Sequence, residues 1–280
     1  MHGELHIAAG DGLMLFVRTD GVHGTAPPLV CLPGLTRNGR DFSTIAERYA
    51  SGRFVVRPDF RGRGRSDYDL SAATYTPETY ATDVLCVLDA LGIESAVLLG
   101  TSLGGSIATL VANLAPARVS GVILNDVGPK LESAGFARIQ SYAGKLPSNA
   151  TWADALAQVR SLAGDAASLI PDATWQRVVR EQYREFGPGD IRPDHDPHIV
   201  AGMAAVDASK LGDTWPLFDG LAAIPTLVLR GARSDLFAAD TVHAMQHRKT
   251  DLVAVTVADR GHCPLLDEPE SLTALDAFLR

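Results

Sequence analysis

A serine lies within a glycine-rich run whose spacing is typical of a reactive nucleophile. Residues 100–105 read GTSLGG, so that Gly100, Ser102 and Gly104 fit the pattern G-x-S-x-G. In this pattern the serine occupies a sharp turn between a buried strand and a helix, which exposes its hydroxyl. An apolar run, AVLL, precedes the motif, and a helix-forming segment rich in small residues follows it. Three fixed positions are a weak signal, so Ser102 needs partners elsewhere in the chain.

The most suitable partner for this serine is a histidine near the C-terminus. A serine hydroxyl is a weak nucleophile until a base takes its proton. Among eight histidines, His262 lies in the segment DRGHC, between the last predicted strand and the last predicted helix. Open parallel sheets place their ligand crevice at such strand ends, so we predict that His262 is the base. His243 and His247 have a metal-like spacing, but no third ligand accompanies them.

Two aspartates are candidates for the acid that orients the histidine. With a serine at a strand-to-helix turn, the acid and then the histidine follow along the chain. Asp235 ends the segment GARSD after one predicted strand, and Asp126 ends the segment VILND after another. We favour the set Ser102, Asp235 and His262 and keep Asp126 as the alternative. Two carboxylates closer to the histidine in sequence are better explained as turn or helix-cap residues: Asp259 and Asp267.

Two backbone amides are predicted to stabilise the oxyanion that forms when a serine attacks a carbonyl. The amide of Leu103 follows the nucleophile at a helix N-terminus. The second donor is expected from the loop LPGLTRN at residues 32–38, where Gly34 permits a tight turn and Leu35 presents its amide.

Six side chains are candidates for contact with a substrate. Two polar ones follow the predicted oxyanion loop, and four apolar ones flank the predicted acid, the base or the end of the helical insertion. They are Arg37, Asn38, Trp215, Phe218, Phe237 and Leu265.

The elements expected around these residues describe a doubly wound α/β fold with a mostly parallel eight-stranded sheet. Apolar or β-branched runs predict strands at residues 4–8, 13–19, 29–32, 54–57, 96–99, 119–124, 226–229 and 252–257. Helical patterns are expected at residues 77–91, 103–115, 238–248 and 269–279. Such an alternation of strands and helices is typical of a sheet covered on both faces.

The alternation of strands and helices stops in the middle of the chain. Residues 131–143, 152–162, 173–186 and 197–206 show only helical periodicity with Gly and Pro breaks. We therefore expect a core domain of residues 1–128 and 214–280, with a helical cap at residues 129–213 inserted between core strands.

Composition narrows the class of protein. The 280 residues carry a net charge of −8, which argues against general affinity for nucleic acid or for an anionic membrane. The arginine-rich stretch RGRGRS is accordingly better explained as a structural loop than as an RNA-binding element. The N-terminus lacks the pattern of a signal peptide, and no apolar run approaches the ~20 residues of a membrane span.

Cysteine usage and the lack of metal motifs extend this picture. The three cysteines, at positions 31, 86 and 263, are far apart and odd in number, which suits a reduced cytoplasmic protein. No CxxC or HExxH spacing occurs, so we expect no metal and no cofactor. A small-molecule substrate is the expected partner, bound by a monomer or a homodimer.

Taken in order, the motifs resemble those of the α/β-hydrolase superfamily over nearly the whole chain. The matching segments are LPGLTRN, PDFRGRGRS, GTSLGG, GARSD and RGHCPLLDEP. The chain is most similar to small capped hydrolases that include esterases, enol-lactonases and ring-cleavage-product hydrolases. It departs from many of them in having Pro33 before Gly34 and Thr101 before the serine, where they have histidine. Members with aspartate as the nucleophile cleave other bonds, so Ser102 favours acyl transfer.

The resemblance and the predicted triad together indicate a serine hydrolase that acts on a small carboxylic ester or lactone through an acyl-enzyme. The alternative enzyme is a C–C hydrolase of dienoic ring-cleavage products, whose substrates carry a carboxylate that Arg37 or Arg138 would meet. The alternative of another class is a ligand receptor that keeps the hydrolase scaffold and turns over very slowly.

Overall fold

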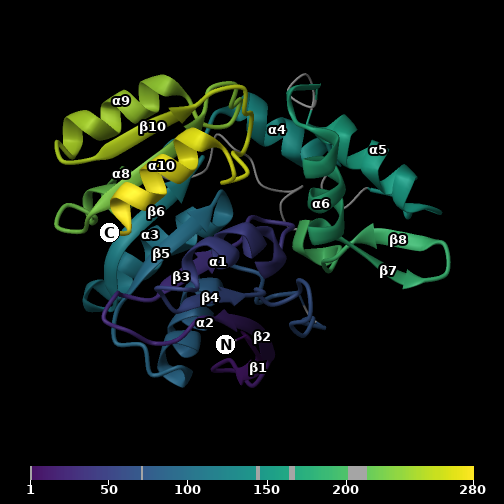
Figure 1. The fold of residues 1–280 in the computed structure, drawn as a ribbon, viewed down its shortest axis with the longest axis horizontal. Coiled ribbons are helices and arrows are strands. Elements are labelled where there is room, and N and C mark those ends of the chain that lie inside the picture. The colour runs from purple at the N-terminus through teal and green to yellow at the C-terminus, as the bar shows by residue number, and fades with distance from the viewer. Residues whose placement is uncertain (1, 71, 143–145, 164–167, 201–212) are drawn as a thin grey trace.

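An eight-stranded sheet forms the centre of the protein. The computed structural model describes residues 2–70, 72–142, 146–163, 168–200 and 213–280. The strand order is β1-β2-β4-β3-β5-β6-β9-β10, and only the β1–β2 and β2–β4 pairs are antiparallel (Figure 1). The predicted α/β class, with a mostly parallel eight-stranded sheet, is confirmed. The strands are β1 His2–Ala8, β2 Met14–Asp20, β3 Leu29–Leu32, β4 Val55–Pro58, β5 Ala96–Thr101, β6 Val119–Asn125, β9 Thr226–Gly231 and β10 Val253–Val257.

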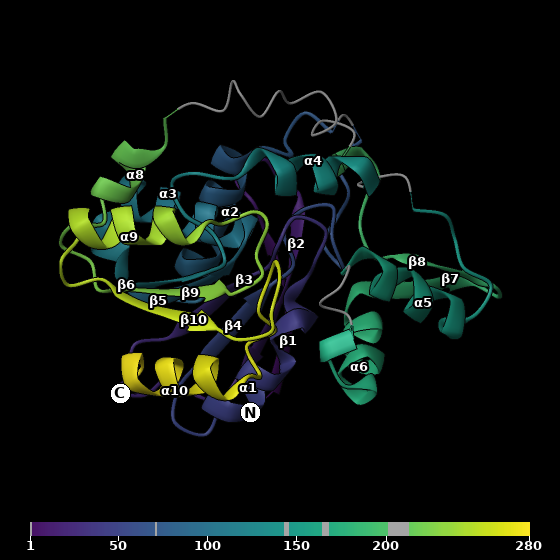
Figure 2. The same ribbon diagram turned by 90° about the horizontal axis from the view of Figure 1, so that it is seen from above.

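Helices cover both faces of this sheet, which explains why its central strands are apolar on both sides. Every residue of β3 and β5 is buried, as expected of parallel strands between two helical layers. One apolar cluster joins the sheet to α2, α3, α8 and α9, and a second joins its other face to α1 and α10 (Figure 2). The bounds are α1 Ser43–Tyr49, α2 Pro77–Ala90, α3 Leu103–Leu114, α8 Trp215–Asp219, α9 Ala239–Arg248 and α10 Pro269–Phe278.

The start of α2 shows how local chemistry fixes these elements. The Thr76 hydroxyl accepts a hydrogen bond from the Thr79 amide at 3.2 Å, and Pro77 occupies the first helical turn. Gly92 adopts a left-handed φ of 63° just beyond the helix. Polar caps and proline favour helix starts, whereas glycine favours the turn that ends them.

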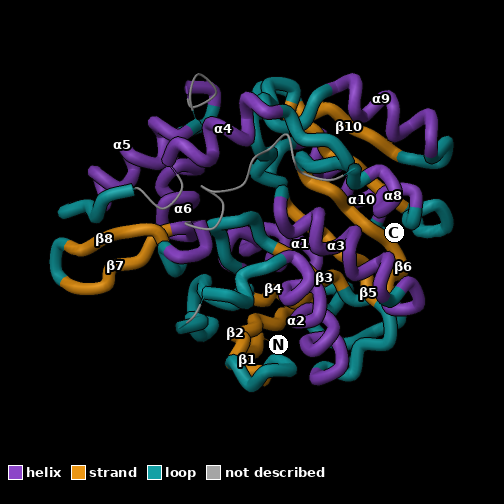
Figure 3. Tube along the Cα trace, turned by 180° about the vertical axis from the view of Figure 1, so that it is seen from behind, coloured by secondary structure: helices purple, strands orange, loops and turns teal. Residues whose placement is uncertain are grey.

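The chain between β6 and α8 forms a separate group of elements beside the sheet. It contains α4 Ser133–Tyr142, α5 Trp152–Leu162, α6 Asp172–Gln182, β7 Tyr183–Gly187 and β8 Asp190–Pro193. We call this group the insertion. Seen from behind, its β7–β8 hairpin is the part farthest from the sheet (Figure 3).

The insertion is not wholly helical, and one predicted helix is too long. The helix expected at residues 173–186 ends at Gln182, and the chain continues as β7, paired antiparallel with β8. The reason is the turn Gly187-Pro188-Gly189, in which Gly189 adopts a φ of 73° that reverses the chain. The helix expected at residues 197–206 falls mostly outside the described residues. None of the helices within the described ranges is long and apolar enough to cross a membrane.

The N-terminus of α3 approaches the ends of β3 and β5 so closely that only glycine fits there. A Cβ on Gly104 would lie 2.0 Å from the carbonyl oxygen of Leu32, and one on Gly100 would lie 2.3 Å from Gly104. These are backbone contacts, so no side chain can move to relieve an added methyl group.

We expect Gly104→Ala to destabilise the protein by about 1–3 kcal/mol, the usual cost of overpacking a core. The matched control is Gly52→Ala, because a Cβ there would meet nothing within 4 Å; we expect it to change stability by less than about 0.5 kcal/mol. Chemical denaturation of both variants checks this. Equal stability of the two variants would show that the α3 contact is not tight in solution.

Candidate active site

Ser102 lies on the tight turn that the glycines permit. It follows β5 directly and precedes α3, with φ 52° and ψ −119°, a left-handed conformation that is uncommon for residues other than glycine. The Ser102 amide donates to the carbonyl of Asn125 at 2.9 Å, and the Gly105 amide donates to the Ser102 carbonyl at 2.9 Å. These bonds hold the turn, and the serine side chain remains partly exposed.

His262 joins this serine to a buried carboxylate. Its Nε2 lies 2.9 Å from the Ser102 Oγ, and its Nδ1 lies 2.7 Å from the Asp126 Oδ2. The imidazole is 9% exposed and the Asp126 side chain is fully buried. A proton on Nδ1 is therefore held toward Asp126, which leaves Nε2 free to accept the serine proton.

Three donors fix the Asp126 carboxylate. The Gly231 amide donates to Oδ1 at 2.8 Å, and the Ser234 hydroxyl and His262 donate to Oδ2 at 2.6 and 2.7 Å. The backbone of Asp126 has a left-handed φ of 57°, which turns the chain immediately after β6. Its position is thus determined by β9 and by the loop that follows β9.

The preference for Asp235 as the partner of His262 is wrong in this structure, and the alternative, Asp126, makes the contact. The two oxygens of Asp235 instead accept from Nε and Nη2 of Arg138 at 2.6 and 2.9 Å. The Arg138 hydrogen bonds lower the pKa of Asp235. The physical reason is that the loop after β9 packs tightly against α4. A Cβ on Gly135 of α4 would lie 2.6 Å from the carbonyl oxygen of Asp235.

Sequence reasoning missed a residue that connects the three loops of the site. Asn125 is fully buried. Its Nδ2 donates to the Thr101 hydroxyl at 3.1 Å and to the Pro264 carbonyl at 3.0 Å. It therefore ties the turn at Ser102 to the loop that carries His262. An asparagine directly before a candidate acid was the only sequence signal for this role.

The two predicted oxyanion amides lie at the start of α3 and in the turn after β3, and their role remains a prediction. Leu103 is the first residue of α3, where amides lack a partner within the helix. The carbonyl of Leu35 accepts from Nε of Arg63 at 2.9 Å. Arg63 is fully buried and also donates to the Tyr80 hydroxyl at 2.7 Å. The arginine-rich loop thus orients the segment that contains Leu35.

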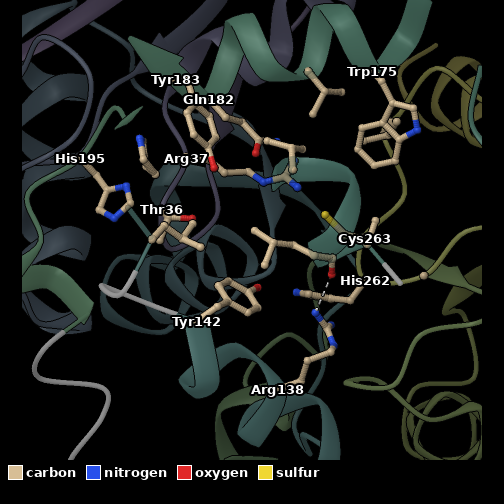
Figure 4. A pocket seen from close by; sticks show the side chains of 18 of the residues that line it. Thr36, Arg37, Arg138, Tyr142, Trp175, Gln182, Tyr183, His195, His262 and Cys263 are labelled. Carbon is tan, nitrogen blue, oxygen red and sulfur yellow. Dashed lines mark hydrogen bonds between the residues drawn. The ribbon is translucent and has the colours of Figure 1, made fainter. Parts of the chain in front are cut away.

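A cavity of about 600 Å³ lies between the core and the insertion. Loops of the core line part of it, among them those that carry Arg37, His262 and Cys263, and side chains of the insertion line the rest (Figure 4). Tyr142, Trp175 and Tyr183 supply aromatic surface there. This size is suitable for a small organic molecule.

Two of the six predicted substrate contacts line this cavity, namely Arg37 and Leu265. Asn38 is buried elsewhere, donating from Nδ2 to the Glu181 carbonyl at 3.1 Å. It caps the short helix at residues 39–42 through its own Oδ1 and holds the end of α6. Its polarity therefore serves structure, and its predicted contact with substrate is wrong.

The three predicted aromatic contacts also lie outside the residues that line the cavity. Phe218 and Phe237 are buried in the apolar cluster between the sheet and its helices. Trp215 packs edge-on against Phe218 at 6.0 Å, with the Arg248 guanidinium over its ring. They belong to the core because they pack in the apolar layer between the sheet and the helices α2, α3, α8 and α9.

A second histidine lines the cavity without having been predicted. His195 is nearly buried and belongs to the loop after β8. Burial and the neighbouring Arg63 lower its pKa to about 4. It is therefore neutral at physiological pH.

In the described part of the chain, no group of three or more His, Cys, Asp or Glu residues is placed to hold a metal ion.

Similarity to known proteins identifies the family to which this chain belongs. The family model described as alpha/beta hydrolase fold matches residues 27–269. This chain is an α/β hydrolase. The structure of an alpha/beta hydrolase from Novosphingobium aromaticivorans superposes with a TM-score of 0.94, at 39% identity over 99% of this chain and 98% of that one.

Two named relatives of this α/β hydrolase are themselves called hydrolases. It is 32% identical to the 3-hydroxybutyrate-oligomer hydrolase of Cupriavidus necator, over 89% of this chain and 87% of that protein. It is 25% identical to the 2-(acetamidomethylene)succinate hydrolase of Mesorhizobium japonicum, over 91% of this chain and 89% of that protein.

The hydrogen bond between His262 and Asp126 is open to direct observation. A ring proton shared with a buried carboxylate is expected to give a strongly downfield proton resonance, because charge-assisted hydrogen bonds are short. We expect this signal to vanish in Asp126→Ala and to persist in Asp235→Ala, provided both variants keep the wild-type circular dichroism. Loss of the signal in Asp235→Ala alone would overturn the arrangement described here.

Proposed function

We propose that this α/β hydrolase is a serine hydrolase that cleaves a small carboxylic ester or lactone. The observation that carries the proposal is the continuous line from the Ser102 Oγ through His262 to Asp126, with separations of 2.9 and 2.7 Å. A nucleophile, a base and an orienting acid in this geometry recur in enzymes that catalyse acyl transfer.

In the first half of the proposed reaction, His262 Nε2 takes the hydroxyl proton as the Ser102 Oγ attacks the ester carbonyl. The amides of Leu35 and Leu103 would donate to the oxyanion of the tetrahedral intermediate. Asp126 holds the imidazole in place and stabilises its positive charge. The C–O bond of the ester then breaks, and the leaving alcohol takes its proton from Nε2.

In the second half, water replaces the alcohol. His262 removes a proton from the water, which attacks the acyl-enzyme carbonyl and forms a second tetrahedral intermediate. When the bond to Ser102 breaks, the serine oxygen recovers the proton from Nε2. The product is a carboxylic acid, and the side chains return to their starting protonation states.

The relatives support an ester substrate. The 3-hydroxybutyrate-oligomer hydrolase has a name that indicates cleavage of hydroxyacid esters, and it aligns over most of both chains. One observation also favours the second candidate, hydrolysis of a C–C bond in a dienoic acid. Arg37 and Arg138 both line the cavity beside His262, where a substrate carboxylate would be accommodated.

Removal of the nucleophile tests the reaction class. We expect Ser102→Ala to lower kcat toward p-nitrophenyl acetate by at least about 10⁴-fold, because the remaining groups cannot form an acyl-enzyme. The variant should also lose labelling by a fluorophosphonate probe. Unchanged turnover in Ser102→Ala would contradict the proposal. A wild-type rate of a few turnovers per hour on every ester, lactone and dienoate would favour a ligand receptor instead.

The two aspartates should differ sharply in their effect on catalysis. We expect Asp126→Asn to lower kcat by about 10⁴-fold, because an amide fixes the wrong tautomer of His262. Asp235→Asn removes a partly exposed ion pair, worth about 1 kcal/mol or less, so its loss with a small neutral ester should stay within about tenfold. Steady-state kinetics on both variants, after thermal unfolding has confirmed that they fold, decides between the two acids.

A further inference from the structure

The cavity wall is rich in arginine, although the molecule as a whole is acidic. The chain has 25 basic and 33 acidic residues and is therefore acidic overall. Among the described residues that line the cavity, five are arginines and two are aspartates. They are Arg37, Arg138, Arg192, Arg233 and Arg260, with Asp190 and Asp235. Each of these arginines also pairs with a carboxylate, so the wall offers a ligand guanidinium donors rather than a net positive charge.

Two of these arginines and a tyrosine line the cavity together with His262. Arg37 comes from the loop after β3, and Arg138 and Tyr142 come from α4. Figure 4 shows Arg37 and Arg138 entering the cavity from opposite sides. Burial raises the pKa of the Tyr142 hydroxyl, and the positive charges of Arg138 and Arg37 oppose this rise.

The three side chains keep donors available within the described structure. Nη1 of Arg37 donates to Asp41 at 3.0 Å, and its side chain is 25% exposed. Arg138 uses Nε and Nη2 on Asp235. Arg138 also donates from Nη1 to the Leu162 carbonyl at 3.4 Å, so each of its two Nη groups keeps one further N–H. Two guanidiniums and a phenol thus converge on one region, and planar guanidinium donors match a carboxylate.

We propose that Arg37, Arg138 and Tyr142 form a subsite for a free carboxylate of the substrate, so that the preferred esters are anionic. This inference rests on the proposed serine hydrolase function and names its substrate class. Asp235 occupies Arg138 when the subsite is empty, and an incoming carboxylate shares or replaces that contact. The carboxylate lies either on the acyl half of the ester or on the alcohol half, as at the free end of a hydroxyacid oligomer.

Two matched pairs of substrates separate these sources of the carboxylate. Ethyl hydrogen succinate and ethyl succinamate differ only in the charge on the acyl half, and ethanol release measures their cleavage. 4-Acetoxybutanoate and 4-acetoxybutanamide differ only in the charge on the alcohol half, and acetate release measures theirs. For each pair we define the anion preference as kcat/KM of the charged member divided by kcat/KM of the neutral member.

We expect wild-type protein to prefer the anion by about tenfold or more in at least one pair, since hydrogen bonds between charged groups are the strong ones. Arg37→Gln and Arg138→Gln should each remove most of that preference, mainly through KM of the charged member. Arg37→Lys should keep part of it, because the charge remains while the planar donor is lost. Asp235→Asn should raise it, because Arg138 loses its competitor.

The control is Arg248→Gln, which removes one positive charge outside the cavity, where Arg248 pairs with Asp219. Its anion preference should match that of wild type. If Arg248→Gln lowers the preference as much as Arg37→Gln, the effect is one of overall charge and the subsite is wrong. The subsite is also wrong if wild type shows no preference in either pair.

A binding measurement keeps this inference separate from the catalytic proposal. In the Ser102→Ala background, succinate should bind more tightly than succinamide by calorimetry, and Arg37→Gln should abolish the difference. Succinate binding that survives Arg37→Gln and Arg138→Gln together would overturn the subsite. If Ser102→Ala still cleaves esters, the serine mechanism fails while the binding result stands on its own.

Discussion

The contact between the N-terminus of α3 and the carboxyl ends of β3 and β5 is the constraint on which the site depends. Backbone meets backbone there, with room for hydrogen but not for a methyl group at Gly104. The close approach forces Ser102 into a left-handed turn, and its amide is held by the carbonyl of Asn125 at the end of β6. The next residue along the chain is Asp126. One packing contact therefore fixes Ser102, the proposed nucleophile, and, through β6, the Asp126 carboxylate that contacts His262.

Much of the fold was predictable because periodicity and turn chemistry act locally. The strand at Leu29–Leu32 and the helix at Trp152–Leu162 have the predicted bounds, since apolar runs and a capping threonine define them. The β7–β8 hairpin was not predictable in this way. The residues of β7 also fit a helix, and only pairing with β8 across the Gly187–Gly189 turn makes them a strand.

The same distinction between local sequence properties and contacts made only in the folded chain applies to the site. Ser102 and His262 were identifiable because their types and their places after strands are local properties. The choice between Asp126 and Asp235 was not, because both follow parallel strands and both can reach the same crevice. It depends on where Arg138 of the insertion lies, which only the folded chain reveals. Asn38 and Phe237 were misassigned for a related reason, as burial decides whether such side chains serve the core or a ligand.

The insertion has its own apolar cluster, centred on Trp175 and Val179. Several of its attachments to the core are polar: Arg138 to Asp235, Arg40 to Asp194, Arg177 to Asp267, and Asn38 to the end of α6. Partly exposed ion pairs weaken as salt screens them, whereas the packed sheet is indifferent to salt. The wall around His262 is thus held by ion pairs as well as by apolar contacts, such as that of Leu265 with this cluster, whereas apolar packing dominates around the strands that carry Ser102 and Asp126. Ionic strength can loosen the enclosure of the cavity while leaving the line from Ser102 to Asp126 intact.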